Sequence, residues 1–265
     1  MCVDCGCSTG HNHEHNHDHK HEHNHNHEHK EVINEDIKNN PQLSHKVTVI
    51  EKILSKNNAM ADEIRKTFDE HKITCFNMMS SPGSGKTTTL ENLAEKLPYK
   101  FGVIEGDLET SRDADRIRKK GIWSFQLQTG RACHLDAGMV KHAIPHFPFD
   151  EVEVAFIENV GNLVCPASYD VGAHYNMVFV SVPEGDDKIE KYPVMFRKAD
   201  IVIITKADML EFFDFDVERA KDAANKLKPG VPVVLLNNKT GEGLDEIIEW
   251  IKNKREEHLK SLSES

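Results

Sequence analysis

The sequence contains no long apolar segment. Nothing in its 265 residues approaches the roughly 18 consecutive apolar side chains of a membrane-spanning helix. Its first residues, MCVD, have neither the basic start nor the apolar stretch of a secretory signal peptide. These absences exclude an integral membrane protein and a secreted protein, so we expect a cytoplasmic one.

The sequence also has no excess of positive charge. Its 33 Lys and Arg residues are outnumbered by 44 Asp and Glu residues, and the formal net charge is −11 at pH 7. Nucleic acids and anionic membrane surfaces are bound through clustered Lys and Arg side chains. We therefore expect neither a nucleic acid nor a membrane among the partners of the protein.

Cysteine is scarce, and its distribution does not suit a disulfide framework. Three of the six cysteines, Cys2, Cys5 and Cys7, form the pattern C-x-x-C-G-C. Thiols stay reduced in the cytoplasm, and such close spacing suits a metal better than disulfides. Three thiolates, with the terminal amine completing the set, can surround one soft or borderline metal ion. The alternative is an exposed chain end with no role.

A histidine-rich segment follows these cysteines. Ten histidines occupy every odd position from His11 to His29, separated by Asn, Asp, Glu and Lys. No apolar side chains alternate with them to hold a strand in place, so we expect residues 1–40 to form a disordered arm. Neutral imidazoles bind Ni²⁺, Cu²⁺ or Zn²⁺ in many overlapping ways, which suits a high capacity for metal ions more than one precise coordination site. A cloning tag is the alternative, but tags are usually uninterrupted.

The chain beyond the arm alternates between helical and strand-like patterns. A helical period runs through residues 45–70, and its expected buried stripe consists of Val49, Ile53, Ala61, Ile64 and Phe68. Strand-like runs follow at residues 73–79, 101–107, 123–129, 153–159, 175–182, 201–208 and 232–238. Further helices are expected at residues 87–97, 113–120, from Asp136 onward, 217–227 and 243–259.

The pattern of these runs defines a fold class. Continuously apolar strands are typical of strands buried on both faces. Their alternation with helices predicts a mostly parallel sheet with right-handed crossovers. The expected fold is therefore α/β, a mostly parallel sheet flanked by helices over residues 41–265, preceded by the arm of residues 1–40.

A glycine-rich turn, SSPGSGKTT at residues 80–88, joins the first strand to the next helix. It matches the phosphate loop G-x-x-x-x-G-K-[ST], except that Ser80 stands where the first glycine is expected. In such loops backbone N–H groups and a helix N-terminus surround the phosphates, the lysine neutralises them and the hydroxyl holds Mg²⁺. A chance glycine-rich turn is disfavoured, because the flanking strand and helix are both present. The residues expected to bind the nucleotide are Gly83, Ser84, Gly85, Lys86, Thr87 and Thr88.

A second motif, TKAD at residues 205–208, follows a buried strand and resembles the N-K-x-D guanine motif. The Asp208 carboxylate can accept hydrogen bonds from guanine N1–H and N2–H₂, a pair of donors that adenine cannot match. Thr205 replaces the usual Asn, which alters part of the loop bracing. The segment NNK at residues 237–239 falls where related GTPases carry Ser-Ala-Lys. We expect the base to contact Lys206, Asp208, Asn238 and Lys239, although a strand followed by a solvated turn is the alternative.

Two further strand-like runs end in carboxylates, Asp107 in EGD and Glu158 in ENVGN. Nucleotides bind at this edge of doubly wound sheets. We expect Thr87, Asp107 and Glu158 to hold Mg²⁺ or its waters, and the Gly161 N–H to contact a γ-phosphate. Ordinary turn carboxylates are the alternative for Asp107 and Glu158.

Cys133, His134 and Cys165 form another candidate set of metal ligands. Cys165 lies four residues beyond Gly161, so a metal held there would share its loop with the γ-phosphate contact. From the residues alone, these three fit loop or core positions equally well. Cys75, inside the first strand, is expected to be a buried small hydrophobe. Histidines without ligand spacing are expected to be structural: His45, His71, His142, His146, His174 and His258.

Several motifs together resemble the HypB family of hydrogenase nickel-incorporation GTPases over essentially the whole chain. They are C-x-x-C-G-C, the His-rich arm, SSPGSGKTT, EGD, ACHLDA, ENVGNLVCP and the late K-x-D. The resemblance implies a P-loop GTPase of the dimerisation-activated class that hydrolyses GTP with Mg²⁺. Its implied catalytic residues are Lys86, Asp107 and Gly161.

The resemblance also implies metal sites and partners. A Ni²⁺ or Zn²⁺ site at Cys133, His134 and Cys165 would be shared across a homodimer favoured by GTP, and the arm cysteines would form a tight nickel site. The implied partners are a nickel-binding accessory protein and the large subunit of [NiFe] hydrogenase, which receives the nickel. Two other functions stay open: a nickel or zinc buffer, and a GTPase that serves another nickel enzyme such as urease.

Overall fold

The computed structural model describes residues 41–107, 112–130 and 132–264, apart from the side chains of residues 41–49, 112 and 113. The chain divides into two compact units, with the boundary between Ser55 and Lys56. The expected metal-binding arm of residues 1–40, with its three cysteines and its histidine tract, lies outside the described residues.

Seven parallel strands form one sheet in the order β3-β2-β4-β1-β5-β6-β7. Their bounds are β1 Thr74–Ser80, β2 Phe101–Asp107, β3 Trp123–Gln128, β4 Val154–Glu158, β5 Tyr175–Ser181, β6 Ile201–Thr205 and β7 Val233–Leu236. Each strand overlaps one of the expected strand-like runs. The α/β class with a mostly parallel sheet is therefore confirmed.

The helices connect and cover these strands. They are α2 Pro41–Glu70, α3 Lys86–Lys96, α4 Arg112–Lys119, α5 Ala137–Ala143, α6 Lys188–Lys191, α7 Pro193–Arg197, α8 Val217–Leu227 and α9 Leu244–Glu264. Short 3₁₀ helices lie at η1 Ile144–His146, η2 Cys165–Ala167, η3 Val182–Glu184 and η4 Ala207–Met209. None of the helices in the described ranges is long and apolar enough to cross a membrane.

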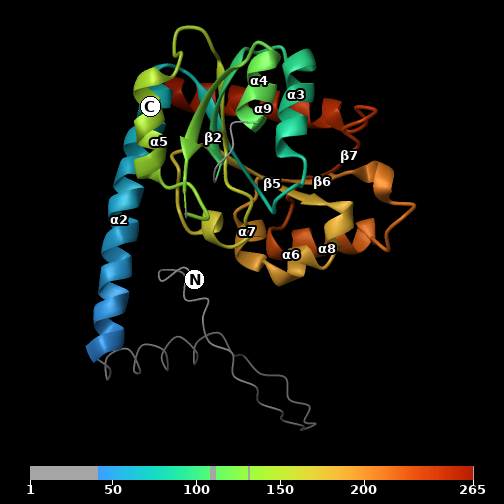
Figure 1. Ribbon diagram of the computed structural model, residues 1–265, viewed down its shortest axis with the longest axis horizontal. Coiled ribbons are helices and arrows are strands. Elements are labelled where there is room, and N and C mark those ends of the chain that lie inside the picture. The colour runs from blue at the N-terminus through green and yellow to red at the C-terminus, as the bar shows by residue number, and fades with distance from the viewer. Residues whose placement is uncertain (1–40, 108–111, 131, 265) are drawn as a thin grey trace. The chain divides into compact units, whose positions relative to one another are not determined.

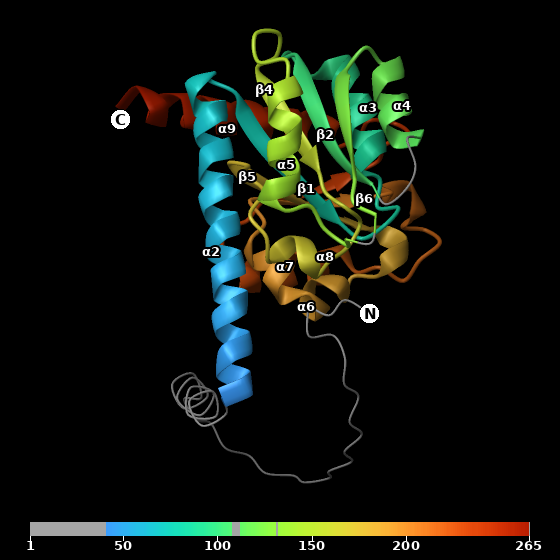
Figure 2. The same cartoon turned by 60° about the vertical axis from the view of Figure 1, so that its left-hand side comes forward.

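Alternate side chains of each central strand enter different cores, as the two-residue repeat of a strand requires. On β1, Phe76 and Met78 pack in the layer that holds α3, α4 and α9, whereas Cys75 and Met79 face the opposite layer. Figure 1 shows α3, α4 and α9 on one side of the sheet and α6, α7 and α8 on the other. Figure 2 shows α5 on the side of the sheet opposite α3. Cys75 is fully buried, which confirms its expected role as a small hydrophobe.

Helix α2 departs from its expected buried stripe. Ala61, Ile64 and Phe68 are buried in the sheet domain as expected, but Ile53 is 49% exposed, so the prediction is wrong there. Asn57, whose side chain donates to the Asp170 carbonyl, is the first buried residue of α2 among those whose side chains are described. The side chain of Val49 lies outside the described residues.

The carboxyl ends of four strands carry the motifs singled out in the sequence. The phosphate loop begins at Ser80, the last residue of β1, while Asp107, Glu158 and Thr205 are the last residues of β2, β4 and β6. Because the strands are parallel, these residues share one edge of the sheet, where ligands of open α/β sheets bind.

Candidate nucleotide and metal sites

The phosphate loop turns sharply between β1 and α3. Gly83 and Gly85 have φ angles of +71° and +91°, in the left-handed region that a side chain disfavours. Gly85 is the N-cap of α3, so the first backbone N–H groups of this helix point into the loop. The helix N-terminus and the loop amides therefore form the cradle that an anionic phosphate chain requires.

Ser80, the departure from the usual phosphate-loop pattern, contacts the loop lysine directly. The buried Lys86 ammonium donates to Ser80 Oγ at 2.7 Å. A glycine at this position would offer no such acceptor. The serine therefore holds the lysine beside the phosphate loop.

A cleft of about 410 Å³ opens in front of this loop, at the carboxyl edge of the sheet. Thr87 Oγ1 donates to Glu158 Oε1 at 2.8 Å, so the structure brings these two candidate magnesium ligands together, and Asp107 lines the same cleft. Hydroxyl and carboxylate oxygens are the ligands that Mg²⁺ prefers. The cleft is lined by residues 82–88, 105–107 and 158–161, together with Arg116.

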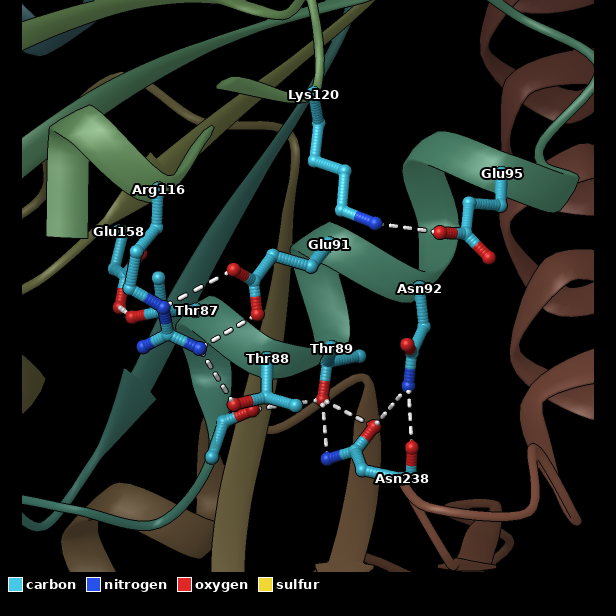
Figure 3. Close-up of polar contacts among 11 residues, drawn as sticks. Thr87, Thr88, Thr89, Glu91, Asn92, Glu95, Arg116, Lys120, Glu158 and Asn238 are labelled. Carbon is cyan, nitrogen blue, oxygen red and sulfur yellow. Dashed lines mark hydrogen bonds and ion pairs between the residues drawn. The ribbon is translucent and has the colours of Figure 1, made fainter. Parts of the chain in front are cut away.

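Arg116 of α4 is a cleft residue that the sequence did not single out. Its guanidinium forms a two-point ion pair with Glu91 of α3, at 3.0 and 2.6 Å, and donates to Thr88 Oγ1 at 3.2 Å. Figure 3 shows this side chain reaching across to α3 beside Thr87 and Glu158. A cation at this place can interact with phosphate, but one arginine in a basic helix gives no sequence signal of its own.

The two segments expected to contact the base lie next to each other. Lys239 forms an ion pair with Asp208, and this hydrogen bond lowers the pKa of the Asp208 carboxyl below its ordinary value. Lys206 has a φ of +56°, so the turn after β6 is tightly bent. Thr205 Oγ1 donates to the Ser84 carbonyl at 2.6 Å, so the residue that replaces the usual Asn still braces the phosphate loop.

Asn238 faces α3. Its amide Oδ1 accepts from Asn92 Nδ2 at 3.0 Å, and its Nδ2 donates to Thr89 Oγ1 at 3.2 Å (Figure 3). A Cβ on Gly85 would lie 3.3 Å from this amide, so Asn238 also closes one side of the phosphate loop. Its side chain is thus placed to support the loop.

The second site combines two thiols and one imidazole. Cys133 Sγ lies 3.0 Å from Cys165 Sγ and 3.8 Å from His134 Nδ1, and the His134 ring stacks on Tyr169 with centroids 4.0 Å apart. Burial lowers the pKa of His134 below its ordinary value, which favours the neutral imidazole that binds metals. Three soft or borderline donors within 4.8 Å of one another suit nickel or zinc. The structure thus brings together all three candidate ligands from two different loops.

A third polar cluster joins residues that are far apart in the sequence. His174 Nε2 and His258 Nε2 both lie 2.8 Å from Asp69 Oδ1. The Cys75 N–H donates to His174 Nδ1, so the proton of that imidazole is on Nε2 and is donated to Asp69. Because this hydrogen bonding occupies the nitrogen that would bind a metal, we interpret the cluster as a structural link. Sequence spacing gave no sign of this cluster.

The fold and the cleft define a P-loop nucleotide-binding protein of the α/β class. A family model described as "CobW/HypB/UreG, nucleotide-binding domain" matches residues 74–235. The hydrogenase/urease maturation factor HypB of Helicobacter pylori is 49% identical over 232 residues, which cover 86% of this chain and 96% of that protein. The hydrogenase maturation factor HypB of Escherichia coli K12 is 44% identical over 207 residues, 77% of this chain and 71% of that protein.

A solved structure agrees with these relatives. The crystal structure of HypB from Helicobacter pylori in complex with nickel has a TM-score of 0.75 and 48% identity, and covers 77% of this chain and 97% of that one. The chain therefore belongs to the HypB family of the CobW/HypB/UreG nucleotide-binding proteins.

Proposed function

We propose that this protein is a GTP-hydrolysing nickel metallochaperone that delivers nickel to the large subunit during [NiFe] hydrogenase maturation. The observation that carries the proposal is that one loop, residues 158–165, joins the phosphate cleft at Glu158 to the metal site at Cys165. The names of the relatives, and the nickel bound by one of them, support the choice of cargo and target.

Phosphoryl transfer needs mainly positioning and charge stabilisation. In the proposed role, Lys86 and the loop amides bind the phosphates, and the Gly161 N–H contacts the γ-phosphate. Thr87, Asp107 and Glu158 are suited to hold Mg²⁺, which would neutralise phosphate charge when bound. Asp208 selects guanine through its two acceptor oxygens, with Lys239 keeping that carboxylate ionised and in place.

Nickel is the cargo in this scheme. The arm of residues 1–40, with Cys2, Cys5 and Cys7, collects it, and the GTPase domain of residues 41–265 holds nickel or zinc at Cys133, His134 and Cys165. GTP binding orders loop 158–165 and favours a homodimer that shares this site, and hydrolysis relaxes the loop so that the metal is released. A nickel-binding accessory protein and the hydrogenase large subunit are the proposed partners.

A complementation experiment tests this function. In a strain that lacks the protein, hydrogenase activity should be lost at low nickel, restored by the wild-type chain, and not restored by Lys86→Ala. Full restoration by Lys86→Ala would contradict the role of nucleotide hydrolysis. Equal hydrogenase activity with and without the protein at low nickel would contradict the target.

A role in urease maturation is a second candidate function, because the Helicobacter pylori relative is named a hydrogenase/urease maturation factor. Urease activity measured in the same strains separates the two targets. A loss of urease activity without a loss of hydrogenase activity would favour this second function.

A further inference from the structure

Two asparagine side chains connect the loop after β4 to the separate segment that carries Cys133 and His134. The first is Asn159, which is only 1% exposed. Its Oδ1 accepts from the Leu135 N–H at 3.0 Å and from the Val160 N–H at 3.0 Å. Leu135 directly follows His134, so this contact fixes the backbone on one side of the metal ligands.

The orientation of the Asn159 amide is set by its neighbours. Its Nδ2 donates to Asn77 Oδ1 on β1 at 3.4 Å, and Asn77 Nδ2 donates to Asn176 Oδ1 on β5 at 3.0 Å. This row of donors leaves Oδ1 of Asn159 as the acceptor that faces Leu135. The contact to the segment that carries Cys133 and His134 is thus anchored in the centre of the sheet.

Asn162 makes the second connection. Its Nδ2 donates to the Cys133 carbonyl at 3.3 Å, while its Oδ1 accepts from the Val164 N–H at 2.8 Å. The backbone of residues 133–135 is therefore attached to loop 158–165 on both sides of His134.

The part of the loop that carries these asparagines also touches the phosphate loop. A Cβ on Gly161 would lie 2.7 Å from the backbone N and Cα of Pro82, so the two loops are in direct backbone contact. Asn159, Val160 and Gly161 line the phosphate cleft as well. The residues that hold the segment with Cys133 and His134 are therefore in direct contact with the phosphate loop and the cleft.

We propose that Asn159 and Asn162 are positioning residues that transmit the nucleotide state to the Cys133 and His134 half of the metal site. This inference rests on the proposed function. Cys165 follows the loop through the covalent chain, whereas these two amides attach the backbone around Cys133 and His134 to the loop. Without them the two halves of the site adapt independently to the metal ion, and its affinity no longer depends on the nucleotide.

The test uses the full chain with Cys2→Ser, Cys5→Ser and Cys7→Ser, so that the thiolate-to-nickel charge-transfer band reports the Cys133 and Cys165 site. Nickel is titrated with GDP bound and with a non-hydrolysable GTP analogue bound, and the ratio of the two affinities is the readout. We expect a ratio of about 5 to 150 in this background. Asn162→Ala and Asn159→Ala should bring it toward one, with nickel binding itself retained.

Two further variants keep the outcome interpretable. Asn162→Asp keeps the acceptor for Val164 and loses the donor to Cys133, so its ratio should also fall. Asn225→Ala, which removes an exposed amide that accepts from the Gly230 N–H, should leave the ratio unchanged.

The possible failures are distinct. One outcome is that the ratio of the two nickel affinities in the Cys→Ser chain is unchanged by Asn162→Ala and by Asn162→Asp. That result would overturn the role of the asparagines while leaving the proposed function intact. A ratio of one in the background itself would overturn both. Equal losses of nickel affinity in the two nucleotide states would show a merely structural role and would also overturn the inference.

Discussion

At the scale of single residues, two departures from the usual GTPase motifs have physical explanations. Ser80 accepts a hydrogen bond from Lys86, and Thr205 donates one to the Ser84 carbonyl, so both side chains hold the phosphate loop. The substitutions change which atoms brace the loop without removing the bracing. The loop between β1 and α3 therefore keeps its bracing despite the imperfect sequence pattern.

Replacing Lys86 should abolish nucleotide hydrolysis. The Lys86→Ala variant loses the cation that faces the phosphates, and we expect the rate to fall roughly 100-fold or more. Phosphate release with saturating GTP measures this, and Lys96→Ala, on the exposed part of the same helix, is the matched control. Turnover retained in Lys86→Ala would show that the phosphate loop is wrongly assigned.

Guanine selectivity should depend on the Asp208 carboxylate. Asp208→Asn loses one acceptor for the guanine donors, and GTP binding should weaken about 10- to 100-fold. The new amide N–H can donate to the C2 carbonyl of xanthine, so XTP should compete better in this variant. Competition between GTP and XTP measures the change, with the exposed Asp214→Asn as the control. Unaltered preference for GTP would place base recognition elsewhere.

At the scale of elements, the seven strands were predictable because most are largely apolar runs between polar turns, and β3 (WSFQLQ) shows the two-residue alternation of a strand. Helices α6 and α7 were not, since four and five residues are too few to show a helical period. The Asp69, His174 and His258 cluster joins α2, the start of β5 and α9, and no local pattern can reveal such a contact.

This cluster should make stability depend on pH. Burial, and then the nearby His258, lower the pKa of His174 from 6.5 to about 4. Between these values the unfolded chain binds more protons than the folded one, so the free energy of unfolding should fall as the pH decreases from about 6.5 to 4. The upper limit of this effect is about 3 kcal/mol.

Urea unfolding at pH 7 and pH 5 measures this dependence. His174→Gln should reduce the difference in unfolding free energy between the two pH values, whatever its effect at pH 7. His142→Gln, at an exposed position, should leave the difference unchanged. If His174→Gln keeps the full difference, another group is responsible for it.

At the scale of the whole molecule, the parallel sheet explains how the phosphate cleft and the candidate metal site come to share a loop. The sequence predicted the fold class, and its short motifs singled out candidate residues that the structure brings together at each site. It could not predict the order β3-β2-β4-β1-β5-β6-β7, which places β4 between β1 and β2. That position sets Glu158 beside Thr87 and brings Cys165 to Cys133.

The coupling between the nucleotide site and the proposed metal site can also be measured through the affinity for the nucleotide. The affinity for a non-hydrolysable GTP analogue is determined with and without saturating nickel, in the chain that carries Cys2→Ser, Cys5→Ser and Cys7→Ser. Because coupling is reciprocal, nickel should change this affinity by the factor by which the analogue changes nickel affinity, about 5- to 150-fold. Cys165→Ala in the same background should abolish the change. Equal analogue affinities with and without nickel, while Cys165 is present, would contradict a GTPase switch that acts on its own metal site.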